Sequence, residues 1–93
     1  MRVRFLSQAR AEWLDAVSYY NEQRAGLGYE FALQVDRTIE RVVQFPEAWQ
    51  QISGRTRRAL IDRFPYGVLY TIDDDVIVVT AVMNLRRGPS SSS

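Results

Sequence analysis

The chain has 93 residues, 46% of them hydrophobic, and a formal net charge of +1, which is ordinary for one small globular domain. It has no cysteine and no histidine, which excludes disulfides, thiol nucleophiles and metal sites built on these residues, and all twelve basic residues are arginine. No segment approaches the roughly 20 consecutive apolar residues of a membrane span, and no signal peptide is recognisable, so we expect a cytoplasmic protein with no membrane partner, metal or cofactor.

The first half of the chain predicts a strand followed by a helical hairpin. Residues 1–6 alternate between polar and apolar side chains, as in a short strand, and Ser7 carries the hydroxyl group of a helix N-cap. Apolar side chains recur at helical spacing over 8–23 and again over 31–45, where a proline ends the pattern. The connection at 24–28 is short, so the helices should lie antiparallel, and either of its glycines can supply a left-handed cap.

The second half predicts three strands in a meander after a polar connection at 47–55. Strands are expected at 57–64 and 68–72, with a corner between them because Pro65 cannot donate to a strand ladder. A turn of three aspartates precedes a β-branched run at 76–83, which has the composition of a strand buried on both faces.

The element order is therefore β-α-α-β-β-β, an α+β fold in which a helical hairpin packs on a small, mostly antiparallel sheet. We expect the first strand to insert beside the last one. The domain should span residues 1–88, and the serine-rich residues 89–93 should form a disordered tail.

Two patterns that resemble ligand sites are interpreted as structural. The aspartates at 73–75 lack the spaced oxygen ligands and the glycine of a calcium loop, so they are expected to form a solvated hairpin turn. The Gly26-Leu27-Gly28 segment has no preceding strand and no following Lys-Ser/Thr, so it is not a phosphate loop.

The aromatic residues leave alternatives open. The Tyr19-Tyr20 pair either caps the rim of the core or anchors an interface. Trp13 lies on the apolar stripe of its helix and is expected in the core. Trp49 lies in a polar connection, where it is either a lid over the sheet or an exposed contact residue.

Arginines at predicted strand ends carry the strongest functional signal. Two open the strand expected at 57–64, a third closes it, and two more follow the last strand. Strand ends of a meander can converge, so these residues predict a basic patch for a carboxylate-rich peptide or nucleic-acid phosphates; the alternative is scattered arginines paired with surface acids. The five residues are Arg57, Arg58, Arg63, Arg86 and Arg87.

Several segments, taken together and in order, resemble the RelE/ParE superfamily of bacterial toxins. The resemblance covers nearly the whole chain up to Arg87, and the tyrosine pair, the Phe-Pro-Tyr segment and the terminal Arg-Arg most resemble the ParE branch, often labelled plasmid-stabilisation proteins. The matching segments lie within 9–20, 26–31, 45–48, 57–70 and 81–87.

The resemblance implies a toxin of a type II toxin–antitoxin pair. Its partner would be a cognate antitoxin whose acidic C-terminal segment folds across the toxin and whose N-terminal part binds DNA, so the toxin would contact DNA only indirectly. The residues expected to bind the antitoxin or the target are Arg57, Arg58, Arg63, Tyr66, Arg86 and Arg87. We expect the groove for the acidic segment to be lined by Arg58, Arg63, Arg86 and Arg87.

The branches of this superfamily differ in their targets. RelE-like members cut messenger RNA on the ribosome, whereas ParE-like members inhibit DNA gyrase without catalysing a reaction themselves. Here Gly67 follows Tyr66, where RelE-like sequences have an arginine, and no general base is recognisable. A nuclease would depend on Arg63, Arg86, Arg87 and Tyr70.

The last segment also departs from the ParE pattern, because it reads Asn-Leu-Arg-Arg-Gly-Pro where that branch often has His-Gly-Arg-Arg-Asp-Pro. The resemblance nevertheless favours a gyrase-binding toxin that acts as a binder rather than as an enzyme. The alternatives are a RelE-like mRNA endoribonuclease and a divergent, non-toxic antitoxin-binding module.

Overall fold

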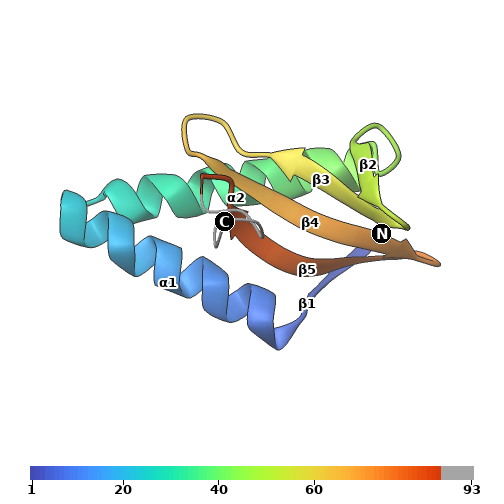
Figure 1. The fold of residues 1–93 in the computed structure, drawn as a ribbon, viewed down its shortest axis with the longest axis horizontal. Coiled ribbons are helices and arrows are strands. Elements are labelled where there is room, and N and C mark those ends of the chain that lie inside the picture. Colours follow the sequence, from blue (N-terminus) through green and yellow to red (C-terminus); the bar gives the residue numbers. More distant parts are fainter. Residues whose placement is uncertain (87–93) are drawn as a thin grey trace.

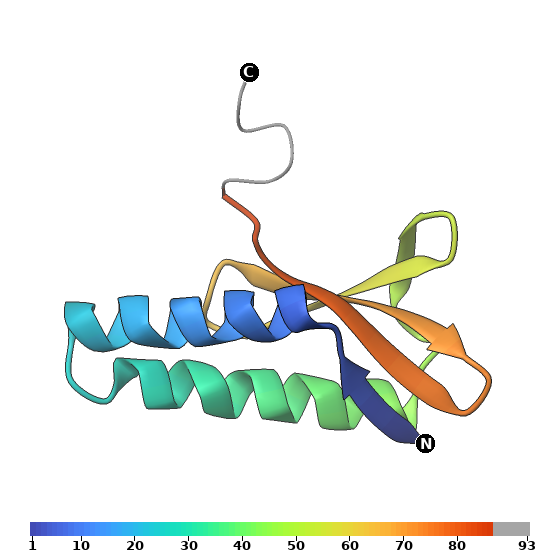
Figure 2. The same ribbon diagram turned by 90° about the horizontal axis from the view of Figure 1, so that it is seen from below.

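The computed structural model describes residues 1–86, which form two layers with both helices on one face of a mixed five-stranded sheet (Figures 1 and 2). The expected α+β class and the helical hairpin are confirmed. Arg87 and the serine-rich tail at 89–93 lie outside the described residues. In chain order the elements are β1 (Arg2–Phe5), α1 (Ser7–Gln23), α2 (Leu27–Gln44), β2 (Gln50–Ser53), β3 (Thr56–Leu60), β4 (Tyr66–Asp73) and β5 (Val76–Asn84).

The strand order is β1-β5-β4-β3-β2, and only the β1–β5 pair is parallel. The expected insertion of the first strand beside the last is thus confirmed. The polar connection expected at 47–55 contains an additional edge strand, β2, which pairs with β3. All four β2 residues are exposed, so no apolar alternation marks this strand in the sequence.

Two local predictions are wrong. Ser7 is the first residue of α1 rather than its N-cap, because the N–H of Leu6 still donates to Val79 O at 3.0 Å and the helix begins immediately after this sheet contact. The strand expected at 57–64 ends at Leu60, and Arg63 lies in the following turn with φ 72°, which an extended strand does not permit.

The two helices approach closely where the hairpin turns. Gly26 precedes α2 with φ 87°, the left-handed conformation expected of a glycine there. A Cβ atom added to Gly28 would lie 2.3 Å from Val17 O, so only glycine fits this crossing. The N–H of Gly28 also donates to Asn21 Oδ1 at 2.9 Å. Within residues 1–86, neither helix combines the length and apolarity needed to cross a membrane.

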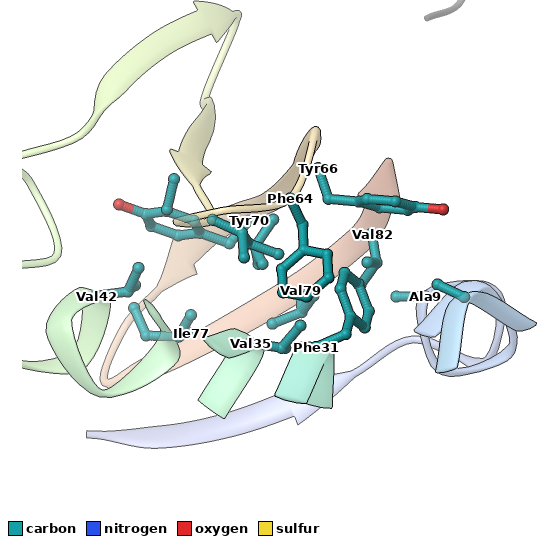
Figure 3. Close-up of a cluster of buried hydrophobic side chains, with 14 residues drawn as sticks. Ala9, Phe31, Val35, Val42, Phe64, Tyr66, Tyr70, Ile77, Val79 and Val82 are labelled. Carbon is teal, nitrogen blue, oxygen red and sulfur yellow. The ribbon is translucent and has the colours of Figure 1, made fainter. Parts of the chain in front are cut away.

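The core fills the space between the helices and the sheet (Figure 3). Phe31 of α2 packs edge-on against Phe64 and Tyr66, with ring centroids 5.2 and 4.9 Å away. Trp13 packs against this core, as expected, and Trp49 also packs against it and is partly buried, which favours the lid. The fully buried aliphatic residues include Val35, Val42, Val68, Ile77 and Val79.

Candidate functional site

A groove of about 680 Å³ opens between α1 and the C-terminal half of β5; we call it the α1–β5 groove. Helix α1 contributes one wall, with the polar side chains of Gln8, Glu12, Asp15 and Tyr19. The other wall is formed by residues 81–84 of β5 and by Tyr66 of β4.

The groove exists because β1 is much shorter than β5. The register of β1 against β5 begins at Arg2↔Val76 and ends at Phe5↔Val79, whereas β5 continues to Asn84. After Leu6 the chain turns into α1, which runs beside the remainder of β5 (Figure 2). Beyond Val79, β5 therefore has β4 on one side and, among the described residues, no strand on the other.

A carboxylate occupies the open edge of β5. The N–H of Val82 donates to Glu12 Oε1 at 2.9 Å, a contact between residues 70 positions apart. Gln8 Nε2 lies 3.4 Å from the other oxygen of Glu12. A side chain of α1 thus supplies the acceptor that a neighbouring strand would otherwise provide.

The backbone of Asn84 also faces the groove. Backbone groups of successive strand residues point alternately to the two sides, so Asn84 faces the same side as Val82. Two further bonds agree with this alternation: the N–H of Leu85 donates towards β4, to Pro65 O at 2.8 Å, and Tyr66 O accepts from Ile61 on the β3 side.

Aromatic and basic groups gather at the far end of the groove. Tyr20 packs against Phe64 and Tyr66, with ring centroids 4.9 and 6.0 Å away, while Tyr19 is half exposed beside it. Burial raises the pKa of Tyr20 above 10.0, with smaller contributions from Tyr66 and Tyr19, and the charge of Arg86 opposes this rise. The backbone N–H of Arg86 donates to Asn84 Oδ1 at 2.9 Å, so Arg86 directly follows the strand residues that line the groove.

Among residues 1–86, the structure does not bring the predicted arginines onto one face of the sheet. Arg57 pairs with Tyr70 on the helix-facing side of the sheet, and its guanidinium donates to Glu47 O at 3.0 Å and to Trp49 O at 2.7 Å. Arg58 points to the opposite face, where its side chain crosses Gly67. Within residues 1–86 the Arg58 guanidinium has no hydrogen-bond or ion-pair partner.

The remaining predicted arginines are near the helical hairpin or outside the described residues. Arg63 forms a salt bridge to Glu30 of α2 at 3.1 Å, and Arg24 lies 3.7 Å from the other oxygen of Glu30. Arg86 is exposed at the end of the α1–β5 groove, and Arg87 lies outside the described residues. Arg57 thus holds the segment after α2, and Arg63 is tied to α2. Arg58 lies half-buried beside Gly67 on the outer face of the sheet, and Arg86 is exposed.

The two predicted tyrosines have different environments. Tyr66 contributes to the groove wall, with its hydroxyl directed towards the α1 side of the core (Figure 3). The hydroxyl of Tyr70 donates to Pro46 O at 2.6 Å, and its side chain is fully buried. Burial raises the pKa of Tyr70 above 10.0, and the charge of Arg57 only partly opposes this. Tyr70 is thus a buried structural hydroxyl that remains protonated near neutral pH.

Sequence reasoning missed the polar wall of α1. Gln8, Glu12, Asp15 and Tyr19 are spaced by four, three and four residues, which places them on one stripe of the helix. This spacing was available in the sequence, but it resembles an ordinary solvated face. Among residues 1–86, no three acidic side chains gather where they would hold a metal ion.

Comparisons with known proteins agree with this architecture. The family model described as "ParE toxin of type II toxin-antitoxin system, parDE" matches residues 3–88. A solved structure described as "Chromosomal ParDE TA system from P. aeruginosa" superposes with a TM-score of 0.81 at 10% identity, covering 91% of this chain and 96% of that one. At this identity the superposition shows a shared fold. No curated protein sequence matches the chain.

Proposed function

Because the chain belongs to the ParE toxin family of type II toxin–antitoxin systems, we propose that it acts by binding and inhibiting DNA gyrase, and that a cognate antitoxin neutralises it. The proposal places the protein in the bacterial cytoplasm, where gyrase acts. DNA would be contacted only through the antitoxin.

The state of Tyr70 is the observation that carries the choice of binding over catalysis. A ribosome-dependent nuclease needs a group that activates the 2′-hydroxyl of the RNA, and Tyr70 is the tyrosine that the sequence assigned to that role. Its hydroxyl is buried, donates to Pro46 O and has a raised pKa. A tyrosine in this state neither reaches a substrate nor loses its proton near neutral pH.

Arg58 and Arg86 are the arginines best placed to contact a macromolecular target. Arg57 is held by two backbone carbonyls and Arg63 by Glu30, so each already has a structural partner. The Arg58 guanidinium lies on the sheet face opposite the helices, and Arg86 is exposed at the end of β5. Guanidinium groups of this kind bind carboxylates and phosphates through paired hydrogen bonds.

A gyrase supercoiling assay with the purified protein tests the proposal. We expect the wild-type protein to inhibit supercoiling, and Arg58→Glu and Arg86→Glu each to weaken the inhibition by reversing a positive charge. Arg37→Glu is the matched control, because Arg37 is an exposed arginine of α2 and its reversal should leave inhibition unchanged.

Three results would contradict parts of this proposal in different ways. Normal supercoiling at a large molar excess of folded protein would remove gyrase as the target. Codon-positioned cuts in mapped transcript 5′ ends after induction would assign the protein to the nuclease branch instead. Normal growth on induction, together with tight antitoxin binding, would identify a non-toxic binding module.

A further inference from the structure

The α1–β5 groove combines an open strand edge with an ordered arrangement of charges. Val82 and Asn84 present backbone groups to it, and Glu12 already holds the Val82 N–H at 2.9 Å. An unpaired edge beside a groove of about 680 Å³ has the geometry that accepts one extended peptide segment as an added strand.

The charges in the groove change sign along its length. Glu12 and Asp15 make the α1 wall of the groove acidic, and Glu12 lies opposite Val82 of the strand. Tyr19, Tyr66 and Asn84 line the far part, and Arg86 follows next to Asn84. A segment that is acidic throughout would therefore meet two carboxylates before reaching the one cation described here.

We propose that the antitoxin places an extended segment along the open edge of β5, with an arginine or lysine between Glu12 and Asp15 and a carboxylate near Arg86. The proposal rests on the function proposed above, and it names the chemistry of the partner segment. Val82 and Asn84 are two positions apart in β5, which corresponds to about 7 Å at about 3.3 Å per strand residue, and Arg86 follows in the turn after the strand.

Glu12 has two successive roles in this arrangement. In the free toxin its carboxylate accepts the Val82 N–H and protects the strand edge from pairing with other chains. On binding, a carbonyl of the incoming segment takes over the Val82 N–H, and the released carboxylate pairs with the cation of the segment. The number of hydrogen bonds at the edge is thereby conserved, and a charge pair is added.

The direction in which Asp15→Arg changes the affinity for the antitoxin distinguishes this proposal from binding of a uniformly acidic segment. Asp15 is exposed, so Asp15→Arg should fold normally. If the segment places a cation there, Asp15→Arg should weaken binding of the antitoxin about tenfold or more, because like charges then face each other. A segment that is acidic at this point would instead bind Asp15→Arg more tightly than the wild-type toxin.

The experiment measures the dissociation constant of the toxin for the full-length protein encoded by the adjacent reading frame, by calorimetry at two salt concentrations. Glu40→Arg is the matched control, since Glu40 is an exposed acid of α2 outside the groove, and its affinity should stay within about twofold of wild type. Glu12→Gln keeps an acceptor for the Val82 N–H and removes the charge, so we expect affinity to fall several-fold with little change in stability.

Each outcome bears on one proposal. Asp15→Arg and Glu12→Gln binding as tightly as wild type, or more tightly, would overturn the assignment of a cation to this part of the groove. Failure of the wild-type toxin to bind the adjacent gene product would instead count against the proposed antitoxin. A basic residue of the partner whose reversal to glutamate restores binding to Asp15→Arg would establish the pairing directly.

Discussion

Tyr66 and Tyr70 lie four residues apart on β4, yet their hydroxyl groups leave the core on opposite sides (Figure 3). Tyr66 reaches the α1–β5 groove, whereas Tyr70 bonds Pro46 O at 2.6 Å and so ties the end of α2 to the sheet. Arg57 secures the adjoining carbonyls of Glu47 and Trp49. On the helix-facing side of β3 and β4, the polar groups of Arg57 and Tyr70 thus hold the segment after α2 in place.

Replacing Tyr70 by phenylalanine should cost about 1 kcal/mol of unfolding free energy at neutral pH, because Pro46 O loses its donor. The folded pKa of Tyr70 is raised, so its protonated hydroxyl contributes stability that is present below about pH 10 and is lost as the pH rises through the folded pKa. Urea unfolding from about pH 7 to pH 11 should therefore show a shallower alkaline decline for Tyr70→Phe than for wild type.

The control for this prediction is Tyr29→Phe, since Tyr29 is 72% exposed and its loss should leave both neutral stability and the alkaline decline unchanged. Burial also raises the pKa of Tyr20, so some decline should remain in Tyr70→Phe. Parallel curves for wild type and Tyr70→Phe would show that Tyr70 does not contribute to it.

At the scale of elements, the helical hairpin depends on how closely its two helices cross. Gly28 sits in the first turn of α2 against the backbone of Val17, with the Asn21 side chain beside it. Helix propensity alone favours alanine over glycine by about 1 kcal/mol. The close approach to a backbone carbonyl outweighs that preference, because a carbonyl at 2.3 Å cannot move without separating the helices.

Gly28→Ala should consequently lower the unfolding free energy by about 1–3 kcal/mol, measured by urea denaturation. Ser18→Ala is the control: it also introduces alanine into the hairpin, at an exposed position of α1, and should change stability by at most about 0.5 kcal/mol. A Gly28→Ala variant more stable than wild type would mean that propensity, rather than the crossing, dominates at this position.

At the scale of the whole described molecule, the first strand closes the sheet by pairing with the last. β1 protects residues 76–79 of β5, Glu12 alone holds the edge at Val82, and β2 forms an exposed outer edge. Local stability should therefore decrease from residues 76–79 to Val82 and then to β2. Amides in a strand that is paired on both sides become exposed only when a larger part of the fold opens.

Native-state hydrogen exchange checks this order. The amides of Ile77 to Val79 should exchange most slowly, that of Val82 faster, and those of β2 fastest. In Glu12→Ala the Val82 amide should exchange faster still, while the amides of Ile77 to Val79 retain most of their protection. Equal protection of β2 and β5 would refute the proposed order.

The sequence by itself determined the helices, the central strands and the α+β class, because these follow from local periodicity and from proline and glycine positions. It also determined that arginine supplies every basic side chain. Strand β2 was not predictable in this way, since its four exposed residues form a strand only through pairing with β3.

Only the tertiary structure decided which polar residues share a site. Successive residues of β3 alternate between the two faces of the sheet, so Arg57 and Arg58 point to opposite faces. Arg63 has a left-handed backbone conformation and lies in the turn after the strand. The α1–β5 groove arises from the different lengths of β1 and β5, strands more than 70 residues apart in the chain. Such contacts depend on register and strand ends, which local sequence patterns do not encode.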